Sequence, residues 1–400
     1  MLDQLGENLA RLRTGRGLTQ EELGAASGVS VDTISRLERG TRKAVRGGTL
    51  SALARSLGVT TADLLGMRPA ERDTHGADQL RRAVHALDLP DFAEVTEVLP
   101  LEQLTDASSV AWAQYLAGQH AEMLTGLPAL MVDTRRAVHA TTGDDSARAA
   151  GLLATSYRLA AGLAGRLQLT DLAAHAAHRA LQIAPHTSRP ELDEAAAMRY
   201  LVWVLVRQGD YQEAERIALH AAQRLDPGLL AAPDPDQVGV FGSLIFNAAS
   251  AAARGGNVDR ADELLRVASA AAVRDGQDRT GEAGVFGPRV AAMQAVDQAV
   301  RAGQPDRAVE LSRRVPPAVG RVPAFWEAGH RLHLAAAAVD LDEWQDSISH
   351  MEAARSLAPQ WARVQPLGQV VMANLLEHWP ARRPGRVAEL AQHYAPRAAG

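Results

Sequence analysis

A short segment of the chain carries side chains whose types and spacing suit the edges of DNA bases. If residues 31–38 form a helix, its outer face presents a branched apolar group, a carboxylate, a hydroxyl and a guanidinium, which are Val31, Asp32, Thr33 and Arg36. Arginine can bind guanine through two hydrogen bonds, a carboxylate can accept one from cytosine N4, and an apolar side chain can contact the thymine methyl group. The pattern predicts a helix that reads the major groove of double-stranded DNA.

Polar and basic side chains around this segment suit the phosphate backbone. Gln20 opens the preceding helical stretch, and its amide can bond to adenine or to a phosphate. Five bases and one acid, Glu38, lie between Arg36 and Arg46, so the positive charge is local. The other residues expected to contact or position DNA are Arg13, Thr19, Gln20, Ser30, Arg39, Arg42 and Lys43.

Two short helices joined by a tight turn are needed to hold these groups in place. Thr19 is a good N-cap for the first helix, whose apolar edge is expected to be Leu23 and Ala26. Gly28 can adopt the positive φ that a sharp turn between helices requires. Ser30 is expected to cap the second helix, whose outer face is the one described above.

The core of this region is expected to be small and rich in leucine. Ile34 and Leu37 form the inner face of the second helix. Apolar spacing predicts three further helices, over residues 5–13, 50–57 and 60–65. Together the five helices predict a compact domain over residues 1–66.

Residues 19–40 closely resemble the helix-turn-helix of the Cro/C1-repressor (XRE) family. The matching residues are Thr19, Gln20, Glu21, Glu22, Leu23, Gly24, Gly28, Val29, Ser30, Thr33, Ile34, Ser35, Leu37, Glu38, Arg39 and Gly40. Two residues depart from the family pattern, because Ser27 replaces an apolar residue and Asp32 stands where a basic or amide side chain is frequent. The resemblance implies a five-helix DNA-binding domain in which Gln20 touches DNA.

Composition limits what the rest of the chain can be. Of its 400 residues, 46% are hydrophobic but only 4% are aromatic, which favours closely packed helices over sheets. The absence of cysteine excludes disulfides, thiolate metal sites and cysteine nucleophiles. We find no signal peptide and no apolar run that could span a membrane, so a cytoplasmic protein is expected. Residues 1–66 carry nine bases and seven acids, and the net charge of −5 therefore leaves −7 for the remainder.

A polar linker is expected at residues 67–79, followed by a helical-repeat domain over residues 80–400. A six-residue turn motif that starts with glycine and closes with a small residue recurs between apolar helical stretches. Full copies begin at Gly209, Gly256 and Gly303, and weaker copies without glycine begin at Gln168 and Asp342. The closing small residues of the five copies are 41, 47, 47 and 39 positions apart.

Each part of this motif has a mechanical reason. Glycine lets the first helix end in a left-handed turn, and the small residue lets the second helix lie close to the first. Such hairpins bury their apolar faces only by stacking on their neighbours, which predicts an α-solenoid. The pattern resembles tetratricopeptide repeats (TPR), but its spacing exceeds their roughly 34 residues, so armadillo- or HEAT-like repeats stay open as the alternative. Residues 80–160 fit the motif poorly and are expected to form an irregular cap.

The inner surface of such a solenoid is the usual binding face, and first helices line it. Polar groups stand there among alanines, where they could hold a regulatory peptide or a small carboxylate: Arg199, Trp203, Asn247 and Arg289. Two structural alternatives stay open. Asn247 can be a core amide bonded to a neighbouring helix, and either arginine can pair with a nearby acid.

Little in the sequence points to an enzyme or to a cofactor. Glu327, His330 and His333 share one helical face, but the set offers three ligands without a familiar zinc spacing, so no metal site is expected. No arrangement of nucleophile and base stands out, and no glycine-rich phosphate loop follows a strand, since no strands are expected.

Taken together, the sequence predicts an all-α, sequence-specific transcription regulator that binds operator DNA through residues 1–66. The solenoid is expected to form a homodimer and to bind a regulatory peptide or small molecule. The domain pair resembles peptide-sensing regulators of Gram-positive bacteria and actinobacterial regulators. The alternative is a DNA-tethered scaffold whose solenoid recruits a protein partner.

Overall fold

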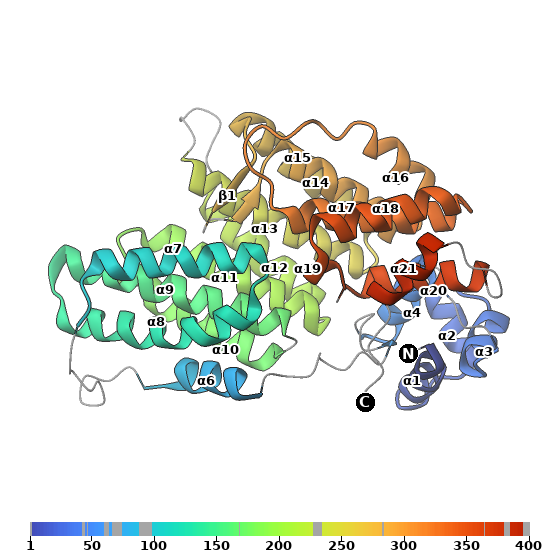
Figure 1. The fold of residues 1–400 in the computed structure, drawn as a ribbon, viewed down its shortest axis with the longest axis horizontal. Helices are drawn as coiled ribbons and strands as arrows, with labels where there is room; N and C mark the ends of the chain where they lie inside the picture. Colours follow the sequence, from blue (N-terminus) through green and yellow to red (C-terminus); the bar gives the residue numbers. More distant parts are fainter. Residues whose placement is uncertain are drawn as a thin grey trace.

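The computed structural model of the protein describes residues 2–41, 45, 47–59, 64–65, 74–87, 98–167, 169–226, 234–281, 284–363, 365–379 and 385–394. Helices make up nearly all of this part of the chain. Figure 1 shows the N-terminal helices, in blue, beside the last helices of the chain, in red, with the paired helices of the repeats between them in sequence. The structure confirms the predicted all-α fold, in which a helix-turn-helix is followed by a helical-repeat region.

Four helices of the N-terminal domain are described, and they enclose a small leucine-rich core. They are α1 (Leu2–Thr14), α2 (Gln20–Ser27), α3 (Val31–Glu38) and α4 (Gly47–Ser56). The predicted inner residues of these helices are buried, among them Leu5, Leu9, Ile34, Leu37 and Leu53. The predicted fifth helix falls mostly outside the described residues, although Leu64 and Leu65 are both buried.

The turn between α2 and α3 has the predicted geometry. Thr19 caps α2 by accepting from the Glu22 backbone N–H at 3.1 Å, and Gly28 has a φ of 70°. The expected apolar edge of α2 is wrong at Ala26, which is exposed, whereas Ser27 is buried. Burial of Ser27 is tolerated because its hydroxyl donates to the Leu23 carbonyl at 2.6 Å.

One carboxylate, that of Glu38, joins three helices and fixes the position of α3. Arg13 of α1 donates to both Glu38 oxygens, at 2.7 and 3.0 Å, and Gln20 of α2 donates to Oε2 at 2.7 Å. The Arg13 and Glu38 side chains are only 14% and 7% exposed. Burial of a two-pronged ion pair restricts α3 to one orientation against α1 and α2.

The segment after the N-terminal domain is helical earlier than expected. α6 (Thr74–His85) starts inside the predicted linker of residues 67–79, because Ala77, Leu80 and Val84 pack into the core of the repeat region. The other predicted linker residues, 67–73, lie outside the described residues. Two long helices, α7 (Leu101–Ala117) and α8 (His120–Ala140), follow α6.

Five helical hairpins make up the repeat region. They are α9 (Gly143–Arg166) with α10 (Thr170–Ile183), α11 (Pro190–Gln208) with α12 (Tyr211–Arg224), α13 (Pro235–Arg254) with α14 (Val258–Asp275), α15 (Pro288–Arg301) with α16 (Pro305–Ser312), and α17 (Ala324–Asp340) with α18 (Trp344–Leu357). A 3₁₀ turn, η2 (Ala184–His186), follows α10. The chain closes with α19 (Pro359–Arg363), α20 (Pro366–His378) and α21 (Gly385–Tyr394).

The recurring turn motif joins the two helices of each hairpin, as predicted. Its glycines have left-handed φ angles of 87° at Gly209, 92° at Gly256 and 71° at Gly303. In the weaker last copy, Asp342 takes the same conformation with a φ of 61°. The closing small residues are fully buried where the second helix meets the first: Ala173, Ala214, Ala261, Ala308 and Ser347.

The expectation that the chain has no strands is wrong for one short hairpin. β1 (Arg279–Gly281) and β2 (Gly284–Phe286) pair antiparallel, with Arg279 opposite Phe286. This hairpin inserts the Phe286 ring against Gly242 of α13, where a Cβ atom would come within 2.0 Å of the ring. Three-residue strands leave no alternation that a sequence pattern can reveal.

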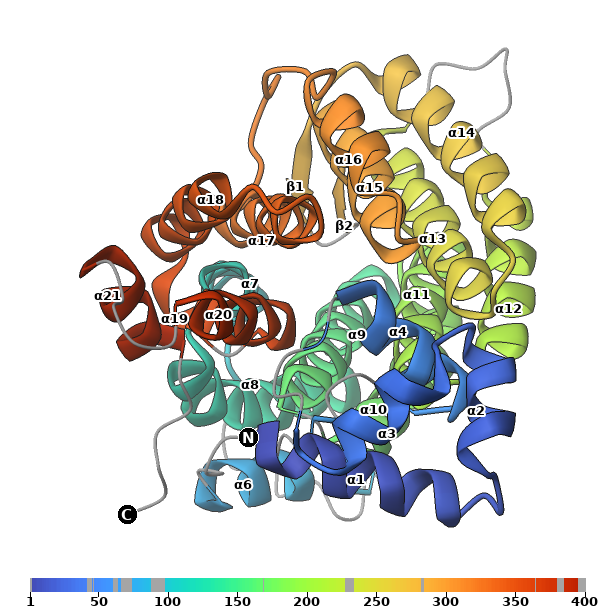
Figure 2. The same ribbon diagram turned by 90° about the vertical axis from the view of Figure 1, so that its right-hand side faces the viewer.

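The repeats curve until α17 returns to α7, and the N-terminal domain lies at one open end of the curve with α4 turned toward its centre (Figure 2). α17 contacts α7, and the guanidinium of Arg166 lies between the rings of Tyr115 and Phe325. α4 packs against α15 and α20. Asn374 of α20 donates to the Val45 carbonyl at 3.0 Å, and Val370 joins the N-terminal core, so the two domains share a packed contact.

The left-handed turn glycines should resist substitution even where a side chain has room. At Gly256 nothing lies within 4 Å of an added Cβ, so Gly256→Ala isolates the backbone strain of a φ of 92°. We expect a destabilisation of about 1–2 kcal/mol. The matched control is Gly151→Ala in the middle of α9, which also has space, and which should stabilise by about 0.5–1 kcal/mol. Thermal denaturation followed by circular dichroism measures both, and equal effects would contradict the turn geometry.

The Glu38 carboxylate should contribute to stability far more than an exposed one. Glu38→Gln leaves the half-buried Arg13 charge without its carboxylate and should cost about 1–3 kcal/mol. The control, Glu310→Gln, removes an ion pair with Arg314 whose side chains are 60% and 71% exposed, and should cost at most about 0.5 kcal/mol. Hydrogen exchange in α3, followed in the full chain as urea is added, compares the stabilities of the two variants. A Glu38 variant as stable as the Glu310 variant would refute the structural role of this ion pair.

Candidate nucleic-acid interface

The outer face of α3 is open to solvent while its inner face fills the N-terminal core. Ile34 and Leu37 are 0% and 1% exposed, whereas Val31 is 37% exposed. Asp32 and Arg36 are also exposed, and Thr33 is half-buried beside Ser30. The packing of α4 against α15 and α20 therefore leaves the predicted recognition face accessible.

Asp32 and Arg36 form an ion pair one helical turn apart on this face. Arg36 Nε donates to Asp32 Oδ1 at 3.0 Å, and the side chains are 58% and 64% exposed. An exposed pair of this kind contributes only about 0.3–0.5 kcal/mol. A two-pronged bond from arginine to guanine discriminates by about 1–3 kcal/mol, so Arg36 can exchange Asp32 for a base.

The capping residues hold the ends of α2 and α3. Ser30 accepts from the Thr33 backbone N–H at 3.3 Å and donates to the Thr33 hydroxyl at 2.9 Å. The Thr19 backbone N–H donates to Glu22 Oε2 at 2.7 Å, and hydrogen bonds from Thr19 lower the pKa of Glu22. The amide nitrogen of Gln20 donates to Glu38 Oε2 at 2.7 Å, so the amide oxygen of Gln20 is the group left for a contact with DNA.

The predicted basic contacts differ in their surroundings. All three nitrogens of Arg13 are engaged, since Nε and Nη2 bind Glu38 and Nη1 donates to the Leu18 carbonyl at 2.7 Å. The structure therefore gives Arg13 a structural role, and its expected phosphate contact stays a prediction. Arg39 is exposed at the end of α3. Arg42 and Lys43 lie outside the described residues.

Sequence reasoning missed the role of Glu38. The residue belongs to the segment that resembles the XRE pattern, but no spacing rule pairs it with Arg13, 25 positions earlier. The pairing depends on how α1 crosses α3, and that crossing is a tertiary feature.

Two of the four predicted ligand-binding residues lie together on neighbouring first helices. Asn247 Nδ2 of α13 donates to the Arg199 carbonyl of α11 at 3.4 Å. This is the structural alternative anticipated for Asn247, an amide that ties one helix to the next. The Arg199 guanidinium stacks on the Tyr200 ring at 4.3 Å, and its Nε and Nη2 are buried without a hydrogen-bond partner.

The other two predicted ligand residues also contact protein groups. Arg289 binds both Glu327 oxygens, at 2.6 and 2.8 Å, and donates to the Pro316 carbonyl at 2.6 Å. The Arg289 guanidinium thus binds acceptors within the protein, including an acid, which is the structural alternative anticipated for the two arginines. The Trp203 ring packs against Gly165 of α9 and under the Arg207 guanidinium at 3.9 Å. Each of the four residues thus contacts other groups of the protein, and their proposed role in binding a ligand stays a prediction.

The residues considered for zinc have other partners. Glu327 binds Arg289, and His333 Nε2 lies 2.8 Å from Asp297 Oδ1. Burial lowers the pKa of His330 to about 4. Across the described ranges, no group of three His, Cys, Asp or Glu side chains is placed to hold a metal ion. Within the same ranges, no helix combines the length and the apolar character needed to cross a bilayer.

Comparison with known proteins agrees with the geometry of the N-terminal domain. The family described as "Helix-turn-helix" matches residues 9–64. An "Uncharacterized HTH-type transcriptional regulator" from Sinorhizobium fredii is 49% identical over 61 residues, which cover 15% of this chain and 78% of that protein. No solved structure matches the chain.

The family match lies within the N-terminal domain and does not extend into the repeat region. The matched segment includes α2, the Gly28 turn and α3, whose outer face is exposed. The relative is a transcriptional regulator, in agreement with the expectation that the protein is not an enzyme. Through its N-terminal domain the chain belongs to the helix-turn-helix family of transcriptional regulators.

Proposed function

We propose that this protein is a sequence-specific transcription regulator that inserts α3 into the major groove of an operator. The observation that carries the proposal is the exposure of the polar edge of α3, above a core formed by its apolar edge. The residues proposed to meet base edges are Val31, Asp32, Thr33 and Arg36. Thr19, Gln20, Ser30 and Arg39, with Arg42 and Lys43, are proposed to face the phosphate backbone.

The charge distribution supports the same orientation on DNA. Residues 67–400 carry a net charge of −7, so the repeat region is repelled by phosphates while the N-terminal domain is attracted. DNA would therefore approach the exposed face of α3, on the side away from the repeats.

We propose that the protein acts as a homodimer through its repeat region. One small domain makes few base contacts, and two half-sites about one helical turn of DNA apart would raise both affinity and specificity. The repeat region is also the proposed site of a regulatory ligand, a peptide or a small molecule. Its packed contact with α4 gives such a ligand a physical route to the DNA-binding domain.

Replacement of Arg36 should weaken specific binding and relax one base preference. Arg36→Ala is expected to lower affinity for the selected operator by about 1–3 kcal/mol, with a smaller effect on random duplex DNA. The control is Arg314→Ala, which removes another exposed arginine, just after α16 in the repeat region. In vitro selection of DNA sites, followed by fluorescence anisotropy, measures both. An unchanged motif and affinity for Arg36→Ala would place the recognition face elsewhere.

Neutralising Asp32 should raise the affinity for DNA, the opposite of the effect expected for Arg36→Ala. Asp32→Asn removes the intrahelical partner of Arg36 and a negative charge near the phosphates, so DNA affinity should rise and cytosine preference at its position should fall. Anisotropy titrations on the same duplexes measure this. Weaker binding to every duplex would show that Asp32 helps to hold α3 instead of opposing DNA.

The dimer proposal predicts a full-length protein with twice the monomer mass. Light scattering of the full chain should give about 85 kDa, twice the chain mass of 42.6 kDa, and the footprint should be palindromic. A monomer with a single asymmetric half-site would rule out the proposed dimer.

A further inference from the structure

Four arginines recur at one structural position along the repeats. Each lies in the last turn of the first helix of its hairpin, two residues before the turn position, and we name this set the arginine row: Arg166 of α9, Arg207 of α11, Arg254 of α13 and Arg301 of α15. They are 41, 47 and 47 positions apart, the spacing of the turns themselves. Because the hairpins stack in register, the repeat aligns these charges along one side of the solenoid.

The row has few anionic partners. Its only ion pair among the described residues joins Arg301 Nε to Asp297 Oδ1 at 2.6 Å, and His333 shares that carboxylate. Arg166 donates to the Tyr115 carbonyl at 2.7 Å. Arg207 lies over the Trp203 ring, and no described residue hydrogen-bonds its guanidinium, which is exposed to solvent.

The electrostatics of the row reflect this shortage. Burial lowers the pKa of Arg254 to about 10, and the charge of Arg301 adds to the effect. The negative ends of the four helix dipoles offset part of the charge, but they supply no carboxylate. The row is therefore a concentration of positive charge inside an acidic domain.

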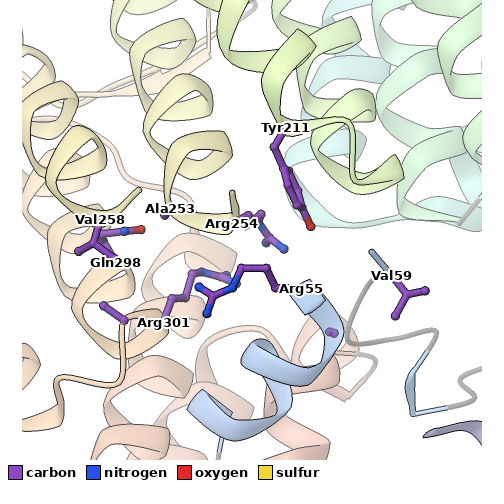
Figure 3. Close-up of a pocket in the computed structure, with 10 residues that line it drawn as sticks. Arg55, Val59, Tyr211, Ala253, Arg254, Val258, Gln298 and Arg301 are labelled. Carbon is purple, nitrogen blue, oxygen red and sulfur yellow. The ribbon is translucent and has the colours of Figure 1, made fainter. Parts of the chain in front are cut away.

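A small cavity joins the end of this row to the DNA-binding domain. Figure 3 shows the guanidinium groups of Arg55, Arg254 and Arg301 directed toward one space between α4 and the repeats. Gln298 lines the same cavity and is only 7% exposed. Its side-chain amide nitrogen is buried and has no hydrogen-bond partner. Arg55 has no hydrogen bond to any described residue. The polar groups around the cavity are mainly donors. Arg254 donates to Ser250 Oγ at 3.4 Å and Arg301 to Asp297 at 2.6 Å, but each guanidinium has further N–H groups that these bonds do not use.

The chemistry and size of the cavity limit what can fill it. Three converging guanidinium groups exclude a cation and favour an oxyanion, because the arginine fork matches phosphate and carboxylate oxygens. A carboxylate has two oxygens and one charge, whereas a phosphate monoester has three free oxygens and about −1.5 to −2 charges to share among three arginines. The cavity volume is about 50 Å³, which limits the group held inside it to about the size of a phosphate.

We propose that the cavity between α4 and the repeats binds the phosphate group of a small molecule through Arg55, Arg254, Arg301 and Gln298. The ligand would join the DNA-binding domain to the repeat region, because Arg55 belongs to the first and the other three residues to the second. This deepens the proposed function by naming the class of effector, and its effect on transcription rests on that function. The rest of a larger ligand would extend along the row toward Arg207.

Calorimetric titration of the full-length protein without DNA tests the site. Inorganic phosphate, glycerol 3-phosphate and succinate are compared at constant ionic strength. We expect saturable binding of both phosphate compounds, tighter than that of succinate. Arg55→Gln and Arg254→Gln should each weaken phosphate binding about tenfold or more, since each removes a charged hydrogen-bond donor. The control Arg266→Gln, which removes an exposed arginine of α14, should bind as the wild type does.

Hydrogen exchange provides the readout that links the two domains. Phosphate should slow hydrogen exchange in α4 of the wild type and leave the exchange rate of α4 unchanged in Arg55→Gln. Arg55 is exposed, so its replacement does not disturb the core. Absence of saturable phosphate binding would refute the site, and equal affinity for succinate would refute the phosphate assignment. Loss of binding in Arg254→Gln but not in Arg55→Gln would refute the link between the domains. Phosphate binding by a protein without DNA affinity would refute the proposed function and leave the site standing.

Discussion

The turn inside each helical hairpin is the constraint on which the rest of this structure depends. A left-handed residue ends the first helix, and a fully buried alanine or serine five positions later sets how closely the second helix packs. Glycine takes this conformation without strain, and Asp342 is the described non-glycine residue that adopts it. Because the geometry recurs from hairpin to hairpin, the stack curves steadily until α17 meets α7.

The same turn sets the positions of the charged groups. An arginine stands two residues before the turn in four successive copies, so the repeat that builds the fold also aligns the charges of the row. The inner side of the curve receives α4, held by Val370 and by the bond from Asn374 to Val45. The helix α3, which we propose reads DNA, stays on the outside of this contact. A change felt at α4 can therefore reach α3 through the shared leucine core while the DNA-facing edge remains open.

Local sequence rules predicted the elements that depend on neighbouring residues. The caps at Thr19 and Ser30, the left-handed Gly28 and the buried pair Ile34 and Leu37 all follow from short-range chemistry, and so do the turn glycines. The features that were missed depend on distant partners. Residues 74–79 are helical because α6 packs against α8. The β1–β2 hairpin places the Phe286 ring in the space beside Gly242.

The predicted site residues also divide into those that depend on local spacing and those that depend on distant partners. The exposed edge of α3 could be read from helical spacing alone. The partners of Arg13, Asn247 and Arg289 could not, since each lies at least 25 positions away on another helix. The arginine row did leave a signal in the sequence, an arginine at a constant place before each turn. That signal has meaning only once the repeats are known to stack with the N-terminal domain against them.

If α3 reads base edges in the major groove, it must cover guanine N7 atoms there. Dimethyl sulfate methylates guanine N7, so methylation protection on a DNA fragment selected by the full-length protein measures this directly. Protected guanines are expected in two half-sites about one helical turn apart. Binding to the same fragment that leaves every guanine N7 reactive would contradict the proposal, because α3 could then not lie in the major groove.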